Sequence, residues 1–100
     1  MNLKRVLWHL LGGTRGGPLR ILILLELRDR PYNTNQLATR LKVDYKTIQH
    51  HLKVLRQNRI LDHRPGYGAV FFLTPDMEES LAEFDLIAAK VAPELRSTHE

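Results

Sequence analysis

A row of basic and amide side chains recurs along residues 45–57 at helical spacing. Its members are Lys46, Gln49, His50, Lys53 and Gln57. Ammonium groups suit phosphates, and a glutamine amide suits base edges because it can both donate and accept hydrogen bonds. A solvated helix face usually mixes both signs of charge, whereas this face has no acid after Asp44. An ordinary solvated surface helix is the alternative interpretation, so the neighbouring segments decide.

Residues 44–58 are predicted to form the helix that carries this row. Asp44 has the short carboxylate that can cap the free amides of a first helical turn. Ile48, Leu52 and Leu55 follow at the i, i+4, i+7 spacing of one buried face. His51 is expected at the edge of that face, whereas His50 is expected to point outward.

Two further helices are predicted before this one. Residues 18–29 are apolar on most sides and begin at Pro18, as expected for a central core helix. Residues 36–41 form a shorter helix, joined to the next by a turn at Lys42 and Val43 of the length that a helix-turn-helix requires. The residues of this shorter helix predicted to face inward are Leu37, Ala38 and Leu41.

Two strands are predicted after the basic helix, over residues 60–64 and 69–73. The second is rich in β-branched and aromatic residues, and residues 65–68 have the sequence Pro-Gly-Tyr-Gly of a turn. A hairpin directly after such a helix forms a wing, whose tip would carry Arg64 and Tyr67 to a minor groove or backbone. A plain hairpin is the alternative, and the order of elements favours the wing.

Residues 1–15 are predicted to combine a short amphipathic helix with a glycine-rich linker. A helix this short is marginal alone, so its apolar stripe must pack on something. Glycines at four of the positions 12–17 break the helix. A phosphate-cradling loop is not indicated, because no Lys-Ser/Thr pair follows. Arg15 could still contact a DNA backbone from this linker.

Residues 75–92 are predicted to form one last helix with a heptad seam of about two heptads. Because the other helices already supply a small core, we interpret this seam as the interface of a homodimer, with the N-terminal helix as second contributor. Packing of the seam against the domain's own core is the alternative. The residues assigned to the dimer interface are Leu3, Leu7, Leu10, Met77, Leu81, Phe84, Ala88 and Val91.

Composition and charge limit the class of protein. The chain has 100 residues, of which 43% are hydrophobic, as expected for one globular domain. It has no cysteine, which excludes disulfides and thiolate metal sites. No apolar run reaches the roughly 18 residues of a membrane span, so no membrane and a cytoplasmic location are expected. Residues 1–37 carry a net charge of +4, residues 38–64 +5 and residues 74–100 −5, which suggests a polyanion at one surface and another partner elsewhere.

Residues 36–61 resemble the DNA-binding core of the ArsR-type winged helix-turn-helix regulators. The likeness is carried by Gln36-Leu37-Ala38 with Leu41, by Tyr45-Lys46-Thr47-Ile48-Gln49-His50-His51-Leu52, and by Lys53-Val54-Leu55. Tyr67-Gly68 and Phe72-Leu73-Thr74 resemble the wing of that family. The Tyr-Lys-Thr and His-His-Leu pieces look most like archaeal members, and the resemblance covers roughly residues 16–75.

The resemblance implies a mainly α fold with a small β-hairpin wing, a winged helix-turn-helix with N- and C-terminal dimerisation helices. One domain over residues 1–100 would then divide into an N-terminal helix and linker (1–15), a DNA-binding core (16–74) and a C-terminal dimerisation helix (75–92).

Metal-sensing members of the family use cysteines on the first helix of the pair, or acid and histidine ligands on the last helix. This chain has no cysteine, and no histidine between Thr74 and His99. His50 and His51 are adjacent and point roughly 100° apart on a helix, which makes a poor chelating pair. Neither a metal nor another cofactor is therefore expected.

The expected function is sequence-specific binding of double-stranded DNA by a dimeric transcriptional regulator at a near-palindromic operator. Lys46, Gln49 and His50 would reach base edges, although a surface role without function remains the alternative for His50. Arg64 and Tyr67 would contact DNA from the wing. The residues expected to hold the backbone are Tyr45, Thr47, Lys53, Arg40 and Lys42, with Arg15 from the linker.

Two other classes of function were weighed. A winged-helix protein-interaction module of transcription or chromatin machinery would bind DNA weakly and without sequence preference, using its acidic last helix as the partner surface. An enzyme is not expected, because no paired carboxylates, nucleophile-base set or metal spacing lies in one segment. A small-molecule effector could bind between the dimer helices, and nothing in the sequence names one.

Overall fold

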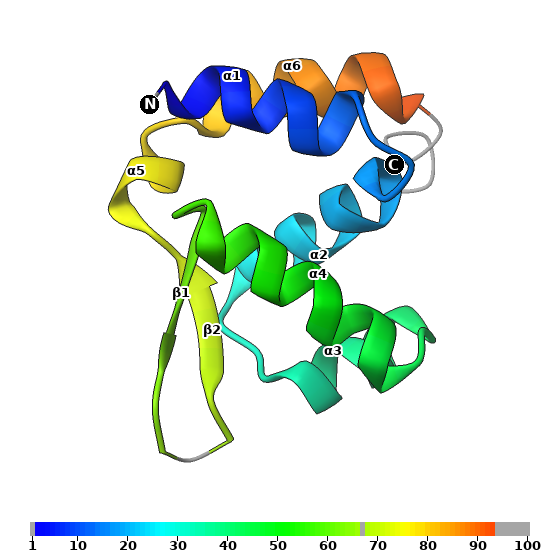
Figure 1. Ribbon diagram of the computed structural model, residues 1–100, viewed down its shortest axis with the longest axis vertical. Helices are drawn as coiled ribbons and strands as arrows, with labels where there is room; N and C mark the ends of the chain where they lie inside the picture. Colours follow the sequence, from blue (N-terminus) through cyan, green and yellow to red (C-terminus); the bar gives the residue numbers. More distant parts are fainter. Residues whose placement is uncertain (1, 67, 94–100) are drawn as a thin grey trace.

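The computed structural model describes residues 2–66 and 68–93. Figure 1 shows α3 and the tip of the hairpin at one end of the molecule, and α1, η1 and α6 side by side at the other. No helix within the described residues is long and apolar enough to cross a membrane. In chain order the elements are α1 (Leu3–Leu7), the π-helical turn η1 (Trp8–Gly12), α2 (Gly17–Asp29), α3 (Thr34–Leu41), α4 (Tyr45–Gln57), β1 (Leu61–Arg64), β2 (Val70–Leu73), α5 (Pro75–Glu78) and α6 (Leu81–Val91).

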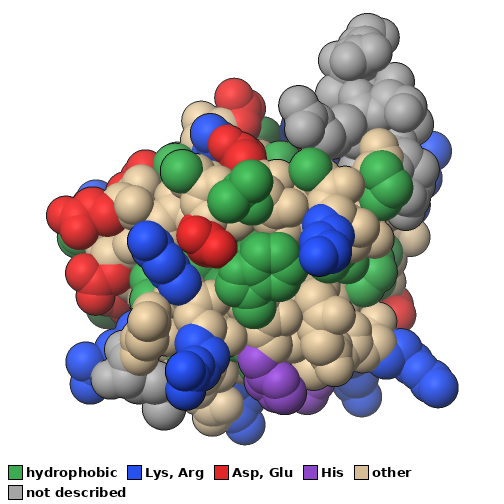
Figure 2. Space-filling view, turned by 90° about the horizontal axis from the view of Figure 1, so that it is seen from above, with side chains coloured by type: hydrophobic (Ala, Val, Ile, Leu, Met, Phe, Trp, Pro, Cys, Tyr) green, Lys and Arg blue, Asp and Glu red, His purple; other side chains and the backbone are tan. Residues whose placement is uncertain are grey.

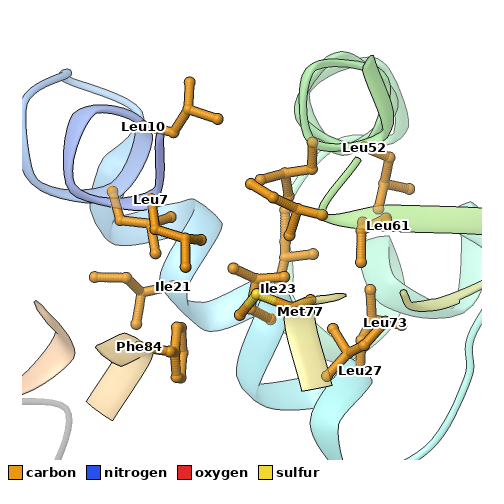
Figure 3. Close-up of a cluster of buried hydrophobic side chains, with 14 of the residues drawn as sticks. Leu7, Leu10, Ile21, Ile23, Leu27, Leu52, Leu61, Leu73, Met77 and Phe84 are labelled. Atoms are coloured by element: carbon orange, nitrogen blue, oxygen red, sulfur yellow. The ribbon is translucent and has the colours of Figure 1, made fainter. Parts of the chain in front are cut away.

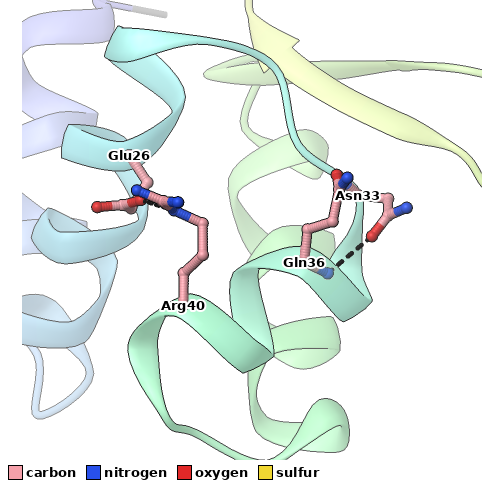
Figure 4. Close-up of polar contacts among 4 residues, drawn as sticks. All are labelled: Glu26, Asn33, Gln36 and Arg40. Carbon is pink, nitrogen blue, oxygen red and sulfur yellow. Dashed lines mark hydrogen bonds and ion pairs between the residues drawn. The ribbon is translucent and has the colours of Figure 1, made fainter.

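The start of α3 is fixed by a reciprocal pair of side-chain hydrogen bonds. The amide N–H of Gln36 donates to Oδ1 of Asn33 (2.8 Å), and the amide N–H of Asn33 donates to Oε1 of Gln36 (2.9 Å). Figure 4 shows both side chains at the first turn of the helix. This capping box satisfies two backbone groups that a helix end would otherwise leave unpaired.

The turn between α3 and α4 is as short as the sequence predicted. Lys42 adopts the left-handed conformation (φ 57°), which ends α3 at the preceding residue. The amide of Val43 donates to the carbonyl oxygen of Ala38 (3.1 Å), and the Val43 side chain packs against the core. The turn therefore sets the angle between α3 and α4 through one apolar plug.

The core is built around α2, which packs against η1, α3 and β2. Ile21 and Ile23 are fully buried on it, and Figure 3 shows them between the N-terminal elements and the helix-turn-helix with its hairpin. A single cluster of buried side chains runs through both halves of the chain. The two ends of the molecule therefore share one hydrophobic core.

The heptad spacing of residues 77–91 is satisfied within the chain, which corrects the interpretation of this seam as a dimer interface. Leu7, Met77 and Phe84 have no exposed surface, and Leu10 and Ala88 expose less than a tenth of theirs. Contact with a second copy requires exposed surface, which these side chains lack. Leu3, Leu81 and Val91 are half-buried against the same core. The spacing does indicate apolar packing, but these side chains pack into the chain's own core, where α6 contacts η1 and α5 contacts β2.

The expected single helix over residues 75–92 is broken into α5 and α6. The hydroxyl of Ser80 donates to the carbonyl oxygen of Asp76 (3.0 Å), and the Ser80 amide donates to that of Met77 (2.9 Å). A serine hydroxyl that bonds back to the preceding turn competes with the helical ladder, and the tightened turn ends α5. The break lets Met77 and Phe84 reach different parts of the core.

The predicted hairpin is confirmed, with β1 and β2 antiparallel and Leu61 opposite Leu73. The connector before α3 adds a short third edge, because Tyr32 and Phe71 exchange backbone hydrogen bonds (2.8 and 3.3 Å). The hairpin is thus attached to the chain segment that leads into α3.

We predict that Phe84→Ala lowers the free energy of unfolding by about 3–5 kcal/mol, because a fully buried aromatic side chain leaves a cavity in the protomer's own core. Urea denaturation at several protein concentrations measures the loss. Lys90→Ala is the control on the same helix, since Lys90 is exposed and should change stability by less than about 0.5 kcal/mol. Equal losses in the two variants would contradict the internal placement of the seam.

Candidate nucleic-acid interface

The two faces of α4 are divided as the sequence predicted. Lys46, Gln49, His50 and Lys53 are exposed on its outer face. The residues buried on its inner face are Ile48, His51, Leu52 and Leu55. The polar row therefore stands free of the core on a helix whose opposite side is anchored.

Asp44 caps α4 through Thr47. The Thr47 hydroxyl donates to Oδ1 of Asp44 (2.8 Å), and the Thr47 amide donates to Oδ2 (3.0 Å). These hydrogen bonds lower the pKa of the Asp44 carboxyl. The expected phosphate donor Thr47 thus already uses its hydroxyl proton within the cap. Tyr45, 49% exposed, is free on the first turn.

A groove of about 590 Å³ lies between the outer face of α4 and the hairpin. Lysine, arginine, histidine and glutamine side chains line it together with a few apolar groups, and no acid is present among the described residues of its wall. Its lining residues are Thr34, Tyr45, Lys46, Gln49, His50, Leu52, Lys53, Arg56, His63, Ala69 and Phe71. We call this space the α4–wing groove. Its one-signed wall suits a polyanion.

The two faces of the hairpin look into different grooves. His63 faces the α4–wing groove, where its ring stacks on Phe71 (centroids 5.5 Å apart). Arg64 follows it on the strand, and lines a second groove beside the end of α2, together with Val70 and Phe72. Successive side chains of a strand point to opposite faces, so the wing residue beside α4 is His63, whereas the sequence assigned the wing contact to Arg64. The other predicted wing residue, Tyr67, lies outside the described residues.

The arginine and lysine residues assigned to the backbone differ in what surrounds them. Arg40 forms an ion pair with Glu26, which Figure 4 shows, and its guanidinium lies 4.8 Å from the centre of the Tyr32 ring. Its hydrogen bond to Glu26 raises the pKa of Arg40. This arginine is therefore engaged between α2 and α3. Arg15 and Lys42 are exposed, on the linker and on the helix-turn-helix turn.

A buried arginine supports α4 from behind. Arg20 of α2 is 7% exposed, and its Nε donates to Nδ1 of His51 (3.1 Å). Its Nη1 donates to the carbonyl oxygen of Leu10 and to Oγ1 of Thr14 (both 3.1 Å). One guanidinium thus joins α2 to α4, to η1 and to the linker. A buried charge of this kind persists only where hydrogen bonds replace its water.

The Arg20 contact fixes the protonation state of His51. Because Nδ1 accepts a hydrogen bond, the neutral ring carries its proton on Nε2. Burial, the charge of Arg20 and the neighbouring His50 all lower the pKa of His51. A protonated His51 would lose the hydrogen bond and would place a second positive charge beside the guanidinium.

The glycine-rich linker is a tight corner. A Cβ atom on Gly17 would lie 2.0 Å from the carbonyl oxygen of Leu11, and one on Gly16 would lie 2.7 Å from Cε1 of His51. Both positions therefore exclude a side chain by close approach. The linker brings Thr14 and Arg20 to the back of α4.

Three polar residues of this region were missed by the sequence analysis. Arg56 is exposed on the last turn of α4 and continues the row of Lys46, Gln49 and Lys53. Its spacing of three from Lys53 was a usable signal. The positions of His63 and Arg20 depend on contacts between distant segments, for which the sequence carried no signal. No group of three or more potential metal ligands occurs within residues 2–66 and 68–93.

We predict that protein stability falls as the pH drops below about 6.5, the ordinary pKa of histidine, because of His51. Its lowered native pKa means that the unfolded chain binds more protons between the native and ordinary pKa values. The neutral ring therefore contributes stability above that window, which is lost as pH falls through it. Chemical denaturation between pH 5 and pH 8 measures this slope. A His51→Gln variant should have a shallower slope than the wild type. A His50→Gln variant should change the slope less, because burial, the largest cause of the lowered His51 pKa, remains in it; a His51→Gln slope equal to that of the wild type would contradict the network.

Comparisons with known proteins agree with this geometry. Residues 17–63, from α2 into β1, match the family described as bacterial regulatory protein, arsR family. Two of the similar solved structures are reduced HlyU from Vibrio cholerae N16961 and AbfR of Staphylococcus epidermidis. HlyU is 24% identical with a TM-score of 0.62, and the match covers 89% of this chain and 90% of that one. AbfR is 20% identical with a TM-score of 0.62, and the match covers 97% of this chain and 71% of that one.

No curated protein sequence matches the chain. The identities to the solved structures are low enough that these likenesses show the fold alone. The chain has the winged helix-turn-helix fold, mainly α with a two-stranded wing, and residues 17–63, which supply most of the lining of its α4–wing groove, carry the ArsR-type match.

Proposed function

We propose that this protein is a sequence-specific regulator of transcription that binds double-stranded DNA as a dimer. The observation that carries the proposal is the α4–wing groove, whose wall combines cations and amides without an acid among its described residues. The ArsR-type match over residues 17–63 supports the same function. In this proposal α4 enters the major groove, as the second helix of a helix-turn-helix does.

The role that we propose for each side chain follows from its position on α4. Lys46 and Gln49 lie in its first two turns, are exposed, and face the groove. A glutamine can make the paired hydrogen bonds that suit adenine, and a lysine those that suit guanine. His50 lies beside them. Lys53 is placed farther along the helix, where it would hold the backbone, while Tyr45 and Lys42 flank the start of the helix.

A dimer is proposed on the α1 and α6 face instead of the buried heptad seam. Leu86 is 60% exposed on α6 and is one of two exposed large hydrophobic residues among those that the structure describes. Trp8 of η1 is half-buried and is tied to α6 by a hydrogen bond from its Nε1 to Glu83 (2.7 Å). Figure 2 shows hydrophobic side chains gathered on this face among charged ones. A partner there leaves α4 and the wing uncovered, and pairs two reading helices on a near-palindromic site.

We predict that Lys46→Ala combined with Gln49→Ala removes the preference for a selected DNA site. Sites are first selected from a random duplex pool with the wild-type protein. Each lost base contact should cost about 1–3 kcal/mol of discrimination between the selected and a scrambled duplex, measured by fluorescence anisotropy. Lys4→Ala combined with Gln57→Ala is the matched control, because it removes the same groups from exposed positions outside the groove.

Selection itself tests the rival function. A protein-interaction module is favoured by the exposed acids Asp76, Glu78 and Glu79 at the other end of the chain. Such a module would yield no enriched site and a steep salt dependence that is equal for all duplexes. Enrichment of a palindromic site would reject it. A double variant that still discriminates the selected duplex would contradict the assignment to α4.

We predict that the chain sediments at about twice its mass of 11.6 kDa at micromolar concentration, and that Leu86→Glu shifts it to the monomer. A charge at an apolar contact must lose its hydration, which opposes association. Tyr45→Glu is the control, because Tyr45 is the other exposed large hydrophobic residue among those that the structure describes and lies on the proposed DNA face. Sedimentation equilibrium measures both. A dimer that survives Leu86→Glu would contradict this interface.

A further inference from the structure

A continuous row of polar side chains runs the length of α4 along the α4–wing groove. Lys46, Gln49, Lys53 and Arg56 follow one another at spacings of three, four and three residues, and all line the groove. At a rise of about 1.5 Å per residue the row spans about 15 Å. The first half of the row carries an amide for reading bases. The second half carries two cations within one turn of each other, which suit the charged backbone rather than base edges.

The opposite wall of the groove carries one polar side chain on a fixed platform. The His63 ring stacks on Phe71, and the backbone of Phe71 is held by two hydrogen bonds to Tyr32. Nδ1 of His63 is buried, and has no hydrogen-bond partner among the residues that the structure describes. Because Nδ1 is buried, Nε2 is the ring nitrogen that can meet a group in the groove.

We infer that the α4–wing groove holds the sugar–phosphate backbone of one DNA strand, with Arg56 on the helix wall and His63 on the wing wall as its two clamps. The inference rests on the proposed function and deepens it by naming the part of the DNA that enters this groove. Neither residue was assigned to DNA from the sequence. Arg64, one position along β1, lines the other groove beside Asp29 and Glu78, where acids oppose a phosphate.

Salt dependence tests the helix wall. Replacing Arg56 with Gln should lower the slope of log K against log salt by about one, because each neutralised phosphate releases about 0.9 counterion. Arg56→Lys keeps the charge and should keep the slope. Arg59→Gln is the matched control, since Arg59 is an exposed arginine three residues away that shares a second groove with Arg56 but does not line the α4–wing groove. It should leave the slope unchanged.

Affinity tests the wing wall. His63→Phe keeps an aromatic ring on Phe71 but has no ring nitrogen, and should weaken binding by about tenfold, the value of a hydrogen bond to a charged group. Arg64→Gln should change the affinity by less than twofold at the salt concentration where the wild type is half-saturated. Thermal unfolding of each variant confirms that it folds. Wild-type affinity in His63→Phe, or a larger loss in Arg64→Gln, overturns the wing assignment.

Neutral phosphates identify the contacted group. Single methylphosphonate substitutions, each of which makes one phosphate neutral, are placed at every position of the duplex in turn. At one position the substitution should weaken binding by the wild type and leave binding by Arg56→Gln unaffected, because this variant already lacks the charge that pairs with that phosphate. If every substitution weakens binding by Arg56→Gln as much as it weakens binding by the wild type, the backbone contact is overturned. If the wild type binds duplexes without sequence preference, the proposed regulator is rejected. The backbone contacts of Arg56 and His63 can still be tested in that case, by measuring the binding of the same variants to a random duplex. A wild type that binds no duplex rejects both.

Discussion

One buried guanidinium holds the parts of this molecule in register. Arg20 has three acceptors, the carbonyl oxygen of Leu10, Oγ1 of Thr14 and Nδ1 of His51, which come from η1, the linker and α4. Burial lowers the pKa of Arg20, and the three hydrogen bonds replace the lost hydration of its charge. The geometry is demanding, because an acceptor that moves away leaves a buried donor unpaired. The position of α4 relative to the N-terminal elements is therefore set by hydrogen-bond direction as well as by apolar contact.

The parts of the fold that depend on local chemistry were predictable from the sequence. The cap at Asp44, the buried stripe through Ile48 and Leu55, and the wing after α4 follow from groups a few residues apart, and each is found as expected. The capping box of Asn33 and Gln36 belongs to the same class. Such signals survive folding because their partners lie within the same turn.

The parts that depend on the choice between partners were not predictable. The heptad spacing of Met77, Phe84 and Ala88 indicates that one face of this segment is apolar. It does not indicate whether that face packs against the same chain or against a second one. Arg40 similarly carries a charge that suits a phosphate, but in the structure it forms an ion pair with Glu26. In each case the partner is distant in sequence, and only the packing of α2 reveals it.

The same distinction explains what was found and missed in the candidate site. Lys46, Gln49 and Lys53 share a helix face, so periodicity alone groups them. His63 joins them because the strand register turns it toward α4 and turns Arg64 away, and a register of one residue more would exchange the two.

The bridge between Tyr32 and Phe71 has a mechanical consequence. Tyr32 immediately precedes Asn33, the residue that caps α3, so the wing is attached by backbone hydrogen bonds one residue from the start of the helix-turn-helix. The Tyr32 ring in turn lies beneath the guanidinium groups of Arg30 and Arg40, one before α3 and one on it. A wing joined in this way cannot swing on its hairpin alone. A displacement of β2 would therefore also move the first turn of α3, so the width of the gap between the wing and α4 depends on both elements.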